Sequence, residues 1–413
     1  MISKVKYEYL LGFISIIWVL FFSNILQLRN EYTLANDEGT YLFAAKSLYL
    51  NLKVDEGRPL FISAVNGFPL LFGFSEYFIF KWAVFVNLIC WISTVFLIYK
   101  IAIKETVIKK GFIISLIFLF CIGNLAITYE LLSESVFIFM LVLSVFLINK
   151  YIMTNKPSYL TLTVALLLLA ILVKPLSLGL VFILIFFFIK RMKEVFFNKF
   201  SFLILFSVSL IFFQMYSLKK ESGNFTISYI DSFTYYNYIG TRADCLKKNI
   251  EFNQGKNQRY IDFIKLSSYE QRKTANDDFK NQLINNPINL LKAFFIDIYI
   301  NSSKGSATVH GCKNLNNSNY FKSFQFIFKV ISKLQNILYT SIGIGLSLLF
   351  ILRWKTQKVF FLILSVLILY IFFVSAISSD QGDRFHIVLY PLIILLLLNT
   401  RWFKNKPPYI LDS

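Results

Sequence analysis

The sequence predicts an all-α polytopic membrane protein of about ten transmembrane helices, with a large outer-side loop before the last three. Three observations support this fold class: the composition, the lengths of the apolar runs and the distribution of basic residues. Of the 413 residues, 56% are hydrophobic and 47 are Phe, whereas soluble domains are about 45–50% apolar. Together with a mean hydropathy of +0.61, this composition excludes a disordered chain, a disulfide scaffold and a soluble multidomain enzyme.

Ten apolar runs approach the roughly 20 residues needed to cross a bilayer. Several are short, so we expect tilt or local thinning of the membrane. The first run is interpreted as a retained anchor, because no small-x-small cleavage site follows it. The two runs beside Lys174-Pro175 could instead form one broken helix, because Pro lacks a backbone donor. The ten runs cover residues 9–28, 78–99, 112–128, 135–149, 159–173, 175–189, 200–216, 336–352, 359–377 and 386–400.

The basic residues favour a topology with both termini in the cytoplasm. In this topology the inner segments hold eighteen Lys and Arg but four Asp and Glu, in a chain with 42 basic and 23 acidic residues. Short cytoplasmic loops are enriched in Lys and Arg in the same way. Most of the net charge of +19 is therefore a topological signal, and membrane lipids rather than nucleic acid are the expected surroundings.

Two outer segments are too long to be simple turns between helices. Residues 29–77 form a first outer loop within a transmembrane core of residues 1–216. Residues 217–335 form an extracytoplasmic loop or small domain, in which we expect a helix near residues 286–299. Residues 336–413 then supply the last transmembrane helices and a short cytoplasmic tail.

Acidic residues near membrane depth are energetically expensive and usually functional. Asp37 and Glu38 follow the first predicted helix, and either could be a general base toward an acceptor. Asp37 could instead cap the helix that follows it. Glu130 and Glu134 are four residues apart and are predicted to share a helical face. They would hold a cation or raise each other's pKa; otherwise one snorkels and the other caps a helix.

Several cationic residues fall on the same predicted side, where they would suit a phosphate. Arg58 lies in the first outer loop and could face an anionic head group. Lys174 lies between two apolar runs and needs a partner, either a substrate phosphate or one of the two Glu residues. Arg384 and His386 precede the last predicted helix. Arg384 could also pair simply with the neighbouring Asp383.

Several familiar motifs are absent from the sequence. It has no Walker loop, no dinucleotide-binding fingerprint, no His-Glu-x-x-His and no Cys-x-x-Cys, so nucleotide-driven pumping and a structural zinc site are unsupported. The chain has two His, which disfavours a His-based triad. Cys245 and Cys312 both fall in the 217–335 segment, and we hypothesise a disulfide between them on an oxidising side of the membrane.

The order of these features resembles the GT-C class of polyprenyl-phosphate-sugar-dependent membrane glycosyltransferases. That class includes protein O-mannosyltransferases and lipid A aminoarabinose transferases. No single motif is specific, but the order and common side of the motifs extend over most of the chain. The matching features are Asp37-Glu38, Arg58-Pro59, the turn from Glu130 to Glu134, Lys174-Pro175, Asn286-Pro287 and Asp383-Arg384-Phe385.

The resemblance implies roles for the candidate residues. Asp37, with Glu38 beside it, would activate the acceptor. The donor phosphate would be held by Lys174, Arg58 and Arg384. The supporting residues would be Glu130, Glu134, Asp383 and His386. Lys174 stands where many relatives have Arg, and no spaced Asp-x-Asp occurs. No metal or other cofactor is therefore assigned, and a divalent metal stays an open alternative.

The implied activity is transfer of a hexose or pentose from a polyprenyl phosphate to a lipid, glycan or protein acceptor. It would take place at the extracytoplasmic face of the inner (cell) membrane, in cell-envelope glycan or glycolipid synthesis. A polysaccharide polymerase or ligase is an alternative, although it would rely on Arg/His pockets rather than an acidic pair. A transporter is a further alternative, but it would show paired broken helices and polar residues at mid-span.

Overall fold

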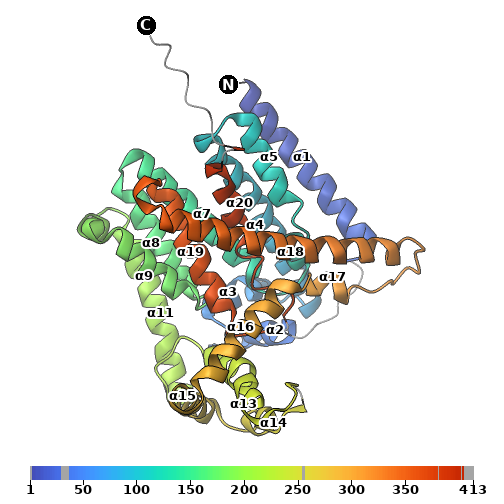
Figure 1. Ribbon diagram of the computed structural model, residues 1–413, viewed down its shortest axis with the longest axis vertical. Coiled ribbons are helices and arrows are strands. Elements are labelled where there is room, and N and C mark those ends of the chain that lie inside the picture. The colour runs from blue at the N-terminus through green and yellow to red at the C-terminus, as the bar shows by residue number, and fades with distance from the viewer. Residues whose placement is uncertain (1, 29–36, 254–255, 380, 401, 404–413) are drawn as a thin grey trace.

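A computed structural model describes residues 2–28, 37–253, 256–379, 381–400 and 402–403 of the chain (Figure 1). Helices are the regular elements of these residues, and they include no strand. The predicted all-α class is therefore confirmed. The N-terminal end of α1 lies at the top of Figure 1, and α13, α14 and α15 lie at the bottom.

Five helices are long and apolar enough to cross a membrane, and a bent pair brings the number to six. The bent pair is α5 (Ile108–Leu119) followed by α6 (Ile122–Ala126) and η2 (Ile127–Tyr129), with a bend of 63°. The predicted count of ten is not confirmed in the described residues. The five are α1 (Ile2–Ile25), α4 (Glu76–Glu105), α7 (Glu134–Thr154), α11 (Ser201–Ser222) and α18 (Phe321–Leu352).

Four predicted runs form apolar helices shorter than the other five, because the chain turns before a full span is complete. The turn at residues 172–176 separates two of them, and Ser177 Oγ donates to Leu167 O at 2.7 Å as the second packs back on the first. The single broken helix is therefore not observed. The four are α8 (Pro157–Ile171), α9 (Ser177–Phe187), α19 (Val359–Ser375) and α20 (Tyr390–Leu396), which continues into η7 (Leu397–Asn399).

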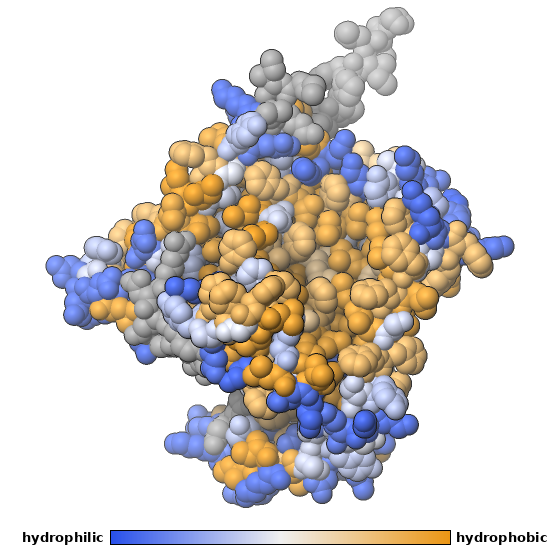
Figure 2. Space-filling model, turned by 180° about the vertical axis from the view of Figure 1, so that it is seen from behind, coloured by the Kyte–Doolittle hydropathy of each residue, from blue (hydrophilic) through white to orange (hydrophobic). Residues whose placement is uncertain are grey.

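The bundle is built around one apolar core, in which α4 packs on α5 and α7, α7 on α8, and α8 on α11. Its outside is also apolar: Figure 2 shows a broad hydrophobic surface over the helices. Phe13 of α1, Phe186 of α9 and Leu205 of α11 are 63%, 78% and 68% exposed. Soluble monomers rarely expose large contiguous apolar patches, so the solvent of this surface is lipid and the chain is a membrane protein.

The segment between α1 and α4 covers one end of the bundle. It contains α2 (Glu38–Asn51), α3 (Leu60–Gly67) and η1 (Phe68–Phe72). Tyr49 of α2 donates to the carbonyl of Ala64 at 2.8 Å and thereby ties α2 to α3. We call this end of the molecule the α2 end. Short elements in the turns elsewhere are η3 (Ile189–Arg191), α10 (Met192–Phe196) and η6 (Trp354–Thr356).

The segment between α11 and α18 is also made of helices, most of them short. The predicted helix near residues 286–299 is confirmed as α16, whereas α18 begins at Phe321, well before the predicted residue 336. Cys245 and Cys312 are both free, so the hypothesised disulfide is wrong. The helices are α12 (Ile230–Tyr235), η4 (Tyr236–Gly240), α13 (Thr241–Lys248), α14 (Gln258–Phe263), α15 (Ser268–Asn285), α16 (Pro287–Ser303) and α17 (Ala307–Gly311).

A buried ion pair joins α13 to α16 within this segment, and the same Arg contacts the loop after α19. Arg242 Nε of α13 lies 2.6 Å from Asp297 Oδ1 of α16, with side chains 9% and 0% exposed. The same guanidinium donates to Ser379 Oγ at 3.0 Å, and Gln381 donates to the Tyr238 hydroxyl at 3.1 Å. These contacts hold the α13–α16 unit against the loop that joins α19 to α20.

We predict that Arg242→Met lowers the free energy of unfolding by about 3–5 kcal/mol, because it leaves the charge of Asp297 buried without its ionic partner. Thermal unfolding of the full chain in detergent measures the effect. Arg191→Met is the matched control, since Arg191 and Glu194 form an exposed pair, and it should leave the melting temperature unchanged. Equal melting temperatures for the two variants would contradict the prediction.

Candidate active site

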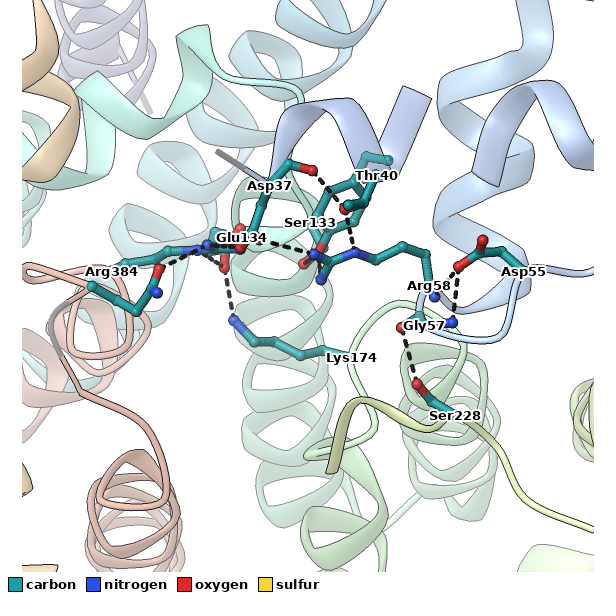
Figure 3. Close-up of polar contacts among 12 residues, drawn as sticks. Asp37, Thr40, Asp55, Gly57, Arg58, Ser133, Glu134, Lys174, Ser228 and Arg384 are labelled. Carbon is teal, nitrogen blue, oxygen red and sulfur yellow. Dashed lines mark hydrogen bonds and ion pairs between the residues drawn. The ribbon is translucent and has the colours of Figure 1, made fainter. Parts of the chain in front are cut away.

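Five charged residues predicted from the sequence meet at the α2 end of the bundle (Figure 3). They come from segments that are far apart along the chain. Asp37 precedes α2, Arg58 precedes α3, Glu134 begins α7, Lys174 lies in the α8–α9 turn and Arg384 lies between α19 and α20. We call them the charge cluster. The predicted gathering of these residues into one mixed-charge site is observed.

Arg384 lies at the centre of the cluster. Its Nη1 is 2.5 Å from Asp37 Oδ2, and its Nε is 2.7 Å from Glu134 Oε1. Lys174 Nζ approaches the same Glu134 oxygen at 3.0 Å, and Arg58 Nη2 lies 3.1 Å from Asp37 Oδ1. The expected partner of Lys174 is thus Glu134. Three cations against two carboxylates leave the cluster with one excess positive charge, which suits an anionic ligand.

Local hydrogen bonds explain the position of Arg58. The side chain of Asp55 accepts from the backbone N–H groups of Gly57 and Arg58 at 2.9 and 2.7 Å and so shapes a tight turn. Arg58 Nε donates to Thr40 Oγ1 at 2.8 Å, and its guanidinium lies 4.3 Å from the centre of the Tyr41 ring. Sequence reasoning missed the roles of Asp55 and Tyr41, although the Asp-x-Gly-Arg spacing carried a turn signal.

The environment of Asp37 makes it an ionised acid. Burial would raise the pKa of its carboxyl, but the guanidinium groups of Arg384 and Arg58 outweigh burial and hold the pKa below its usual value. The side chain keeps 37% exposure. It makes no capping hydrogen bond to α2, so its side chain serves the charge cluster instead of capping.

Glu38 contacts the turn before α7. Its Oε1 accepts from the backbone N–H of Leu131 at 2.8 Å, and the residue is 2% exposed. The predicted shared face of Glu130 and Glu134 is wrong, because η2 ends at Tyr129 and α7 begins only at Glu134. A turn between the two therefore separates the carboxylates, and Glu134 alone joins the cluster.

Asp383 and His386 support the loop that carries Arg384. No ion pair joins Asp383 to Arg384 among the described residues; Asp383 is buried and its backbone carbonyl accepts from the N–H of His386 at 2.8 Å. His386 Nδ1 lies 3.2 Å from Thr340 Oγ1 and from Asn336 Oδ1. His386 therefore anchors the loop to α18 and does not touch the charge cluster.

A large cavity of about 920 Å³ opens beside the charge cluster. All five members of the cluster line one part of it. The remaining wall is mainly apolar and comes from α12, α15, α16 and α19, with Phe233, Phe279, Leu290, Phe294 and Val374 among its residues. The cavity thus offers a cationic end and a hydrophobic wall to one ligand.

A second cavity, of about 220 Å³, also reaches the charge cluster. Its lining includes Asp37, Glu38, Glu130 and Asp383. Within the described part of the chain, no group of three or more His, Cys, Asp or Glu is placed to hold a metal ion. The structure therefore assigns no metal ligands to these acids.

Comparisons with known proteins give a likeness at the level of structure. No protein-family model matches the sequence, and no curated protein matches it either. Among solved structures the chain is similar to the crystal structure of ArnT from Cupriavidus metallidurans bound to undecaprenyl phosphate. The TM-score is 0.44 at 11% identity, over 94% of this chain and 77% of that chain. A likeness of this extent carries no argument about activity, which must come from the site itself.

We predict that Gly123→Ala destabilises the loop that carries Arg384. A Cβ at this position of α6 would lie 2.1 Å from Asp383 Oδ2 and 2.8 Å from Ile387 Cγ2, and overpacking of this kind costs about 1–3 kcal/mol. Thermal unfolding should show a lower melting temperature. Gly345→Ala is the control, because nothing lies within 4 Å of its Cβ position; an unchanged melting temperature for Gly123→Ala would contradict the close packing.

We also predict that Asp37→Asn flattens the acid-side pH dependence of stability. The lowered pKa of Asp37 means that its carboxylate stabilises the fold above the usual pKa, and that this contribution is lost as pH falls through the lowered pKa. Below about pH 4, the usual range of an Asp, the melting temperature of the wild type should fall faster than that of the variant. Parallel curves would contradict the pairing with Arg58 and Arg384.

Proposed function

We propose that the protein is an integral membrane glycosyltransferase that moves a sugar from a polyprenyl-phosphate donor to an acceptor. The observation that carries this proposal is the large cavity, where a cationic end and an ionised Asp lie beside a long apolar wall. A lipid-linked sugar phosphate has the same sequence of parts: an anion, a sugar and a hydrocarbon chain.

The donor fits the charges of the site. A sugar joined to a polyprenyl phosphate carries one negative charge on its phosphodiester, which balances the single excess positive charge of the cluster. In the proposed complex Lys174, Arg58 and Arg384 contact the phosphate oxygens. The prenyl chain lies along the apolar wall from α12, α16 and α19.

The reaction is a displacement at the anomeric carbon of the donor. The acceptor oxygen forms the new bond to this carbon while the bond from carbon to phosphate oxygen breaks. The phosphate leaves with the electron pair and is stabilised by the cations, and Asp37 takes the acceptor proton. A phosphate bound to Arg58 and Arg384 also neutralises part of the positive charge that lowers the pKa of Asp37. The pKa of the Asp37 carboxyl then rises, which makes it a more effective base.

The proposed reaction takes place at the extracytoplasmic face of the inner (cell) membrane. Basic residues in the predicted inner loops favour a cell-membrane topology with cytoplasmic termini, and the α2 end then lies on the extracytoplasmic side. A hexose or pentose is the proposed cargo, and cell-envelope glycan or glycolipid synthesis the proposed role. A donor that arrives already activated needs no nucleotide-binding domain at the site.

We expect Asp37→Asn to lower sugar transfer by about 100-fold or more, as loss of a positioned base does. The assay uses membranes with radiolabelled polyprenyl-phosphate hexoses and pentoses and measures label in the product. Asp277→Asn is the control, because Asp277 is an exposed acid on α15. Unimpaired transfer by Asp37→Asn would remove this residue from the mechanism.

The cations are tested in the same membranes. Lys174→Ala and Arg384→Ala should raise the KM for the donor more than the KM for the acceptor, because the lost contacts are to the donor phosphate. Titration of each substrate separates the two constants. A larger effect on the acceptor would count against a phosphate role for these residues.

A further inference from the structure

The smaller cavity borders the same charge cluster as the larger one. Among the described residues, the two cavities share only Asp37, Gln381 and Arg384. Asp37 is therefore accessible from both. A group bound in the smaller cavity can reach Asp37 without entering the space that the lipid-linked donor would occupy.

The lining of the smaller cavity is acidic and hydrogen-bonding. Besides Asp37 it includes Glu38, Glu130 and Asp383, together with the hydroxyl of Thr308. Thr308 donates a hydrogen bond to Glu130. Asp383 is 3% exposed, and its Oδ2 has no hydrogen-bond partner in the part of the chain that the structure describes.

Charge restricts what this cavity can bind. Its cationic lining residues are Arg384 and Lys313, and Arg384 already pairs with Asp37 and Glu134. A phosphate or carboxylate placed here would face the carboxylates of Asp37 and Glu38, and like charges brought together cost several kcal/mol. Binding of an anionic ligand in this cavity is thus disfavoured.

Protonation makes the same wall suitable for hydroxyl groups. Burial raises the pKa of Glu130 to about 7, with the charge of Glu38 adding to the effect and the Thr308 hydrogen bond opposing it. Burial likewise raises the pKa of Asp383 to about 7. Near neutral pH these carboxyls are partly protonated, so they can both donate to and accept from a hydroxyl.

We infer that the smaller cavity is the acceptor subsite and that it takes a neutral, hydroxyl-bearing sugar rather than a phosphate group. The inference rests on the proposed function, because it uses Asp37 as the base. The acceptor hydroxyl contacts Asp37 from this side, and its neighbouring hydroxyls contact Glu130 and Asp383. Residues of the segment from Ala307 to Lys313 line the same cavity.

Binding of simple sugars to the full chain in nanodiscs tests the site. Saturation-transfer NMR with methyl glucoside, galactoside and mannoside should detect binding to the wild type. Gly311→Phe should abolish it, because the Cβ position of Gly311 meets no atom within 4 Å and the ring can fill the cavity. Gly345→Phe is the matched control on exposed α18 surface, also with an open Cβ position, and should bind normally. No binding to the wild type, or equal binding by both variants, overturns the inference.

Charged probes test the ligand class. For the binding that Gly311→Phe removes, glucose 1-phosphate should bind at least about tenfold more weakly than methyl glucoside, a difference of about 1.4 kcal/mol. Binding of glucose 1-phosphate that persists in Gly311→Phe belongs to the larger cavity, which Gly311 does not line. Glu130→Lys should narrow this gap, whereas Glu251→Lys, the same change on an exposed residue outside the cavity, should leave it unchanged. If glucose 1-phosphate or glucosamine binds more tightly than methyl glucoside at the site that Gly311→Phe blocks, the neutral-acceptor assignment is overturned.

Binding of undecaprenyl phosphate tests the donor site independently of the acceptor subsite. Its affinity should be the same for the wild type and for Gly311→Phe, because Gly311 does not line the larger cavity. If the wild type does not bind undecaprenyl phosphate, this result counts against the proposed donor. The sugar-binding result would still decide whether the smaller cavity is a sugar site.

Discussion

The pairing of Arg384 with two carboxylates is the interaction on which the α2 end depends. A charge inside a low-dielectric region is tolerated only when it is paired and hydrogen-bonded. Arg384 and Glu134 are 13% and 1% exposed at their side chains, so neither can rely on water. The ion pair between Arg384 and Glu134 holds the α19–α20 loop against α7. Asp37 pairs with Arg384 and Lys174 pairs with Glu134, so the start of α2 and the α8–α9 turn meet at the same point.

The bend in the α5–α6 segment serves the same loop. A straight helix would continue through Cys121, but the backbone there is extended, and α6 leaves at 63°. Gly123 then lies so close to Asp383 that a side chain would collide with it. The break lies in buried backbone around Cys121 and Ile122, where non-helical structure at membrane depth is tolerated, and it places Gly123 against the residue next to Arg384.

The sequence was informative where one physical rule dominated. Long apolar runs located the helices, and the cost of unpaired charge in lipid predicted that Lys174, Arg384 and Asp37 would meet. It was less informative where the outcome depended on contacts between distant segments. Glu38 turns to the backbone of Leu131 and Tyr41 stacks on Arg58, and neither follows from local pattern. Span number was also poorly predicted, because hydropathy records apolar length but not where a turn interrupts it.

The charge cluster joins residues from opposite ends of the chain, since Asp37 and Arg384 are separated by 347 positions. During synthesis the early helices enter the membrane long before the segment with Arg384 is made. Lys174 and Arg58, which pair with Glu134 and Asp37 in the complete structure, are made earlier and can pair with these acids first. Asp37 and Glu134 thus each have a cationic partner that precedes Arg384 in the chain. Completion of the charge cluster is consequently a late event in biogenesis, and an incomplete chain still holds a cation for each of the two acids.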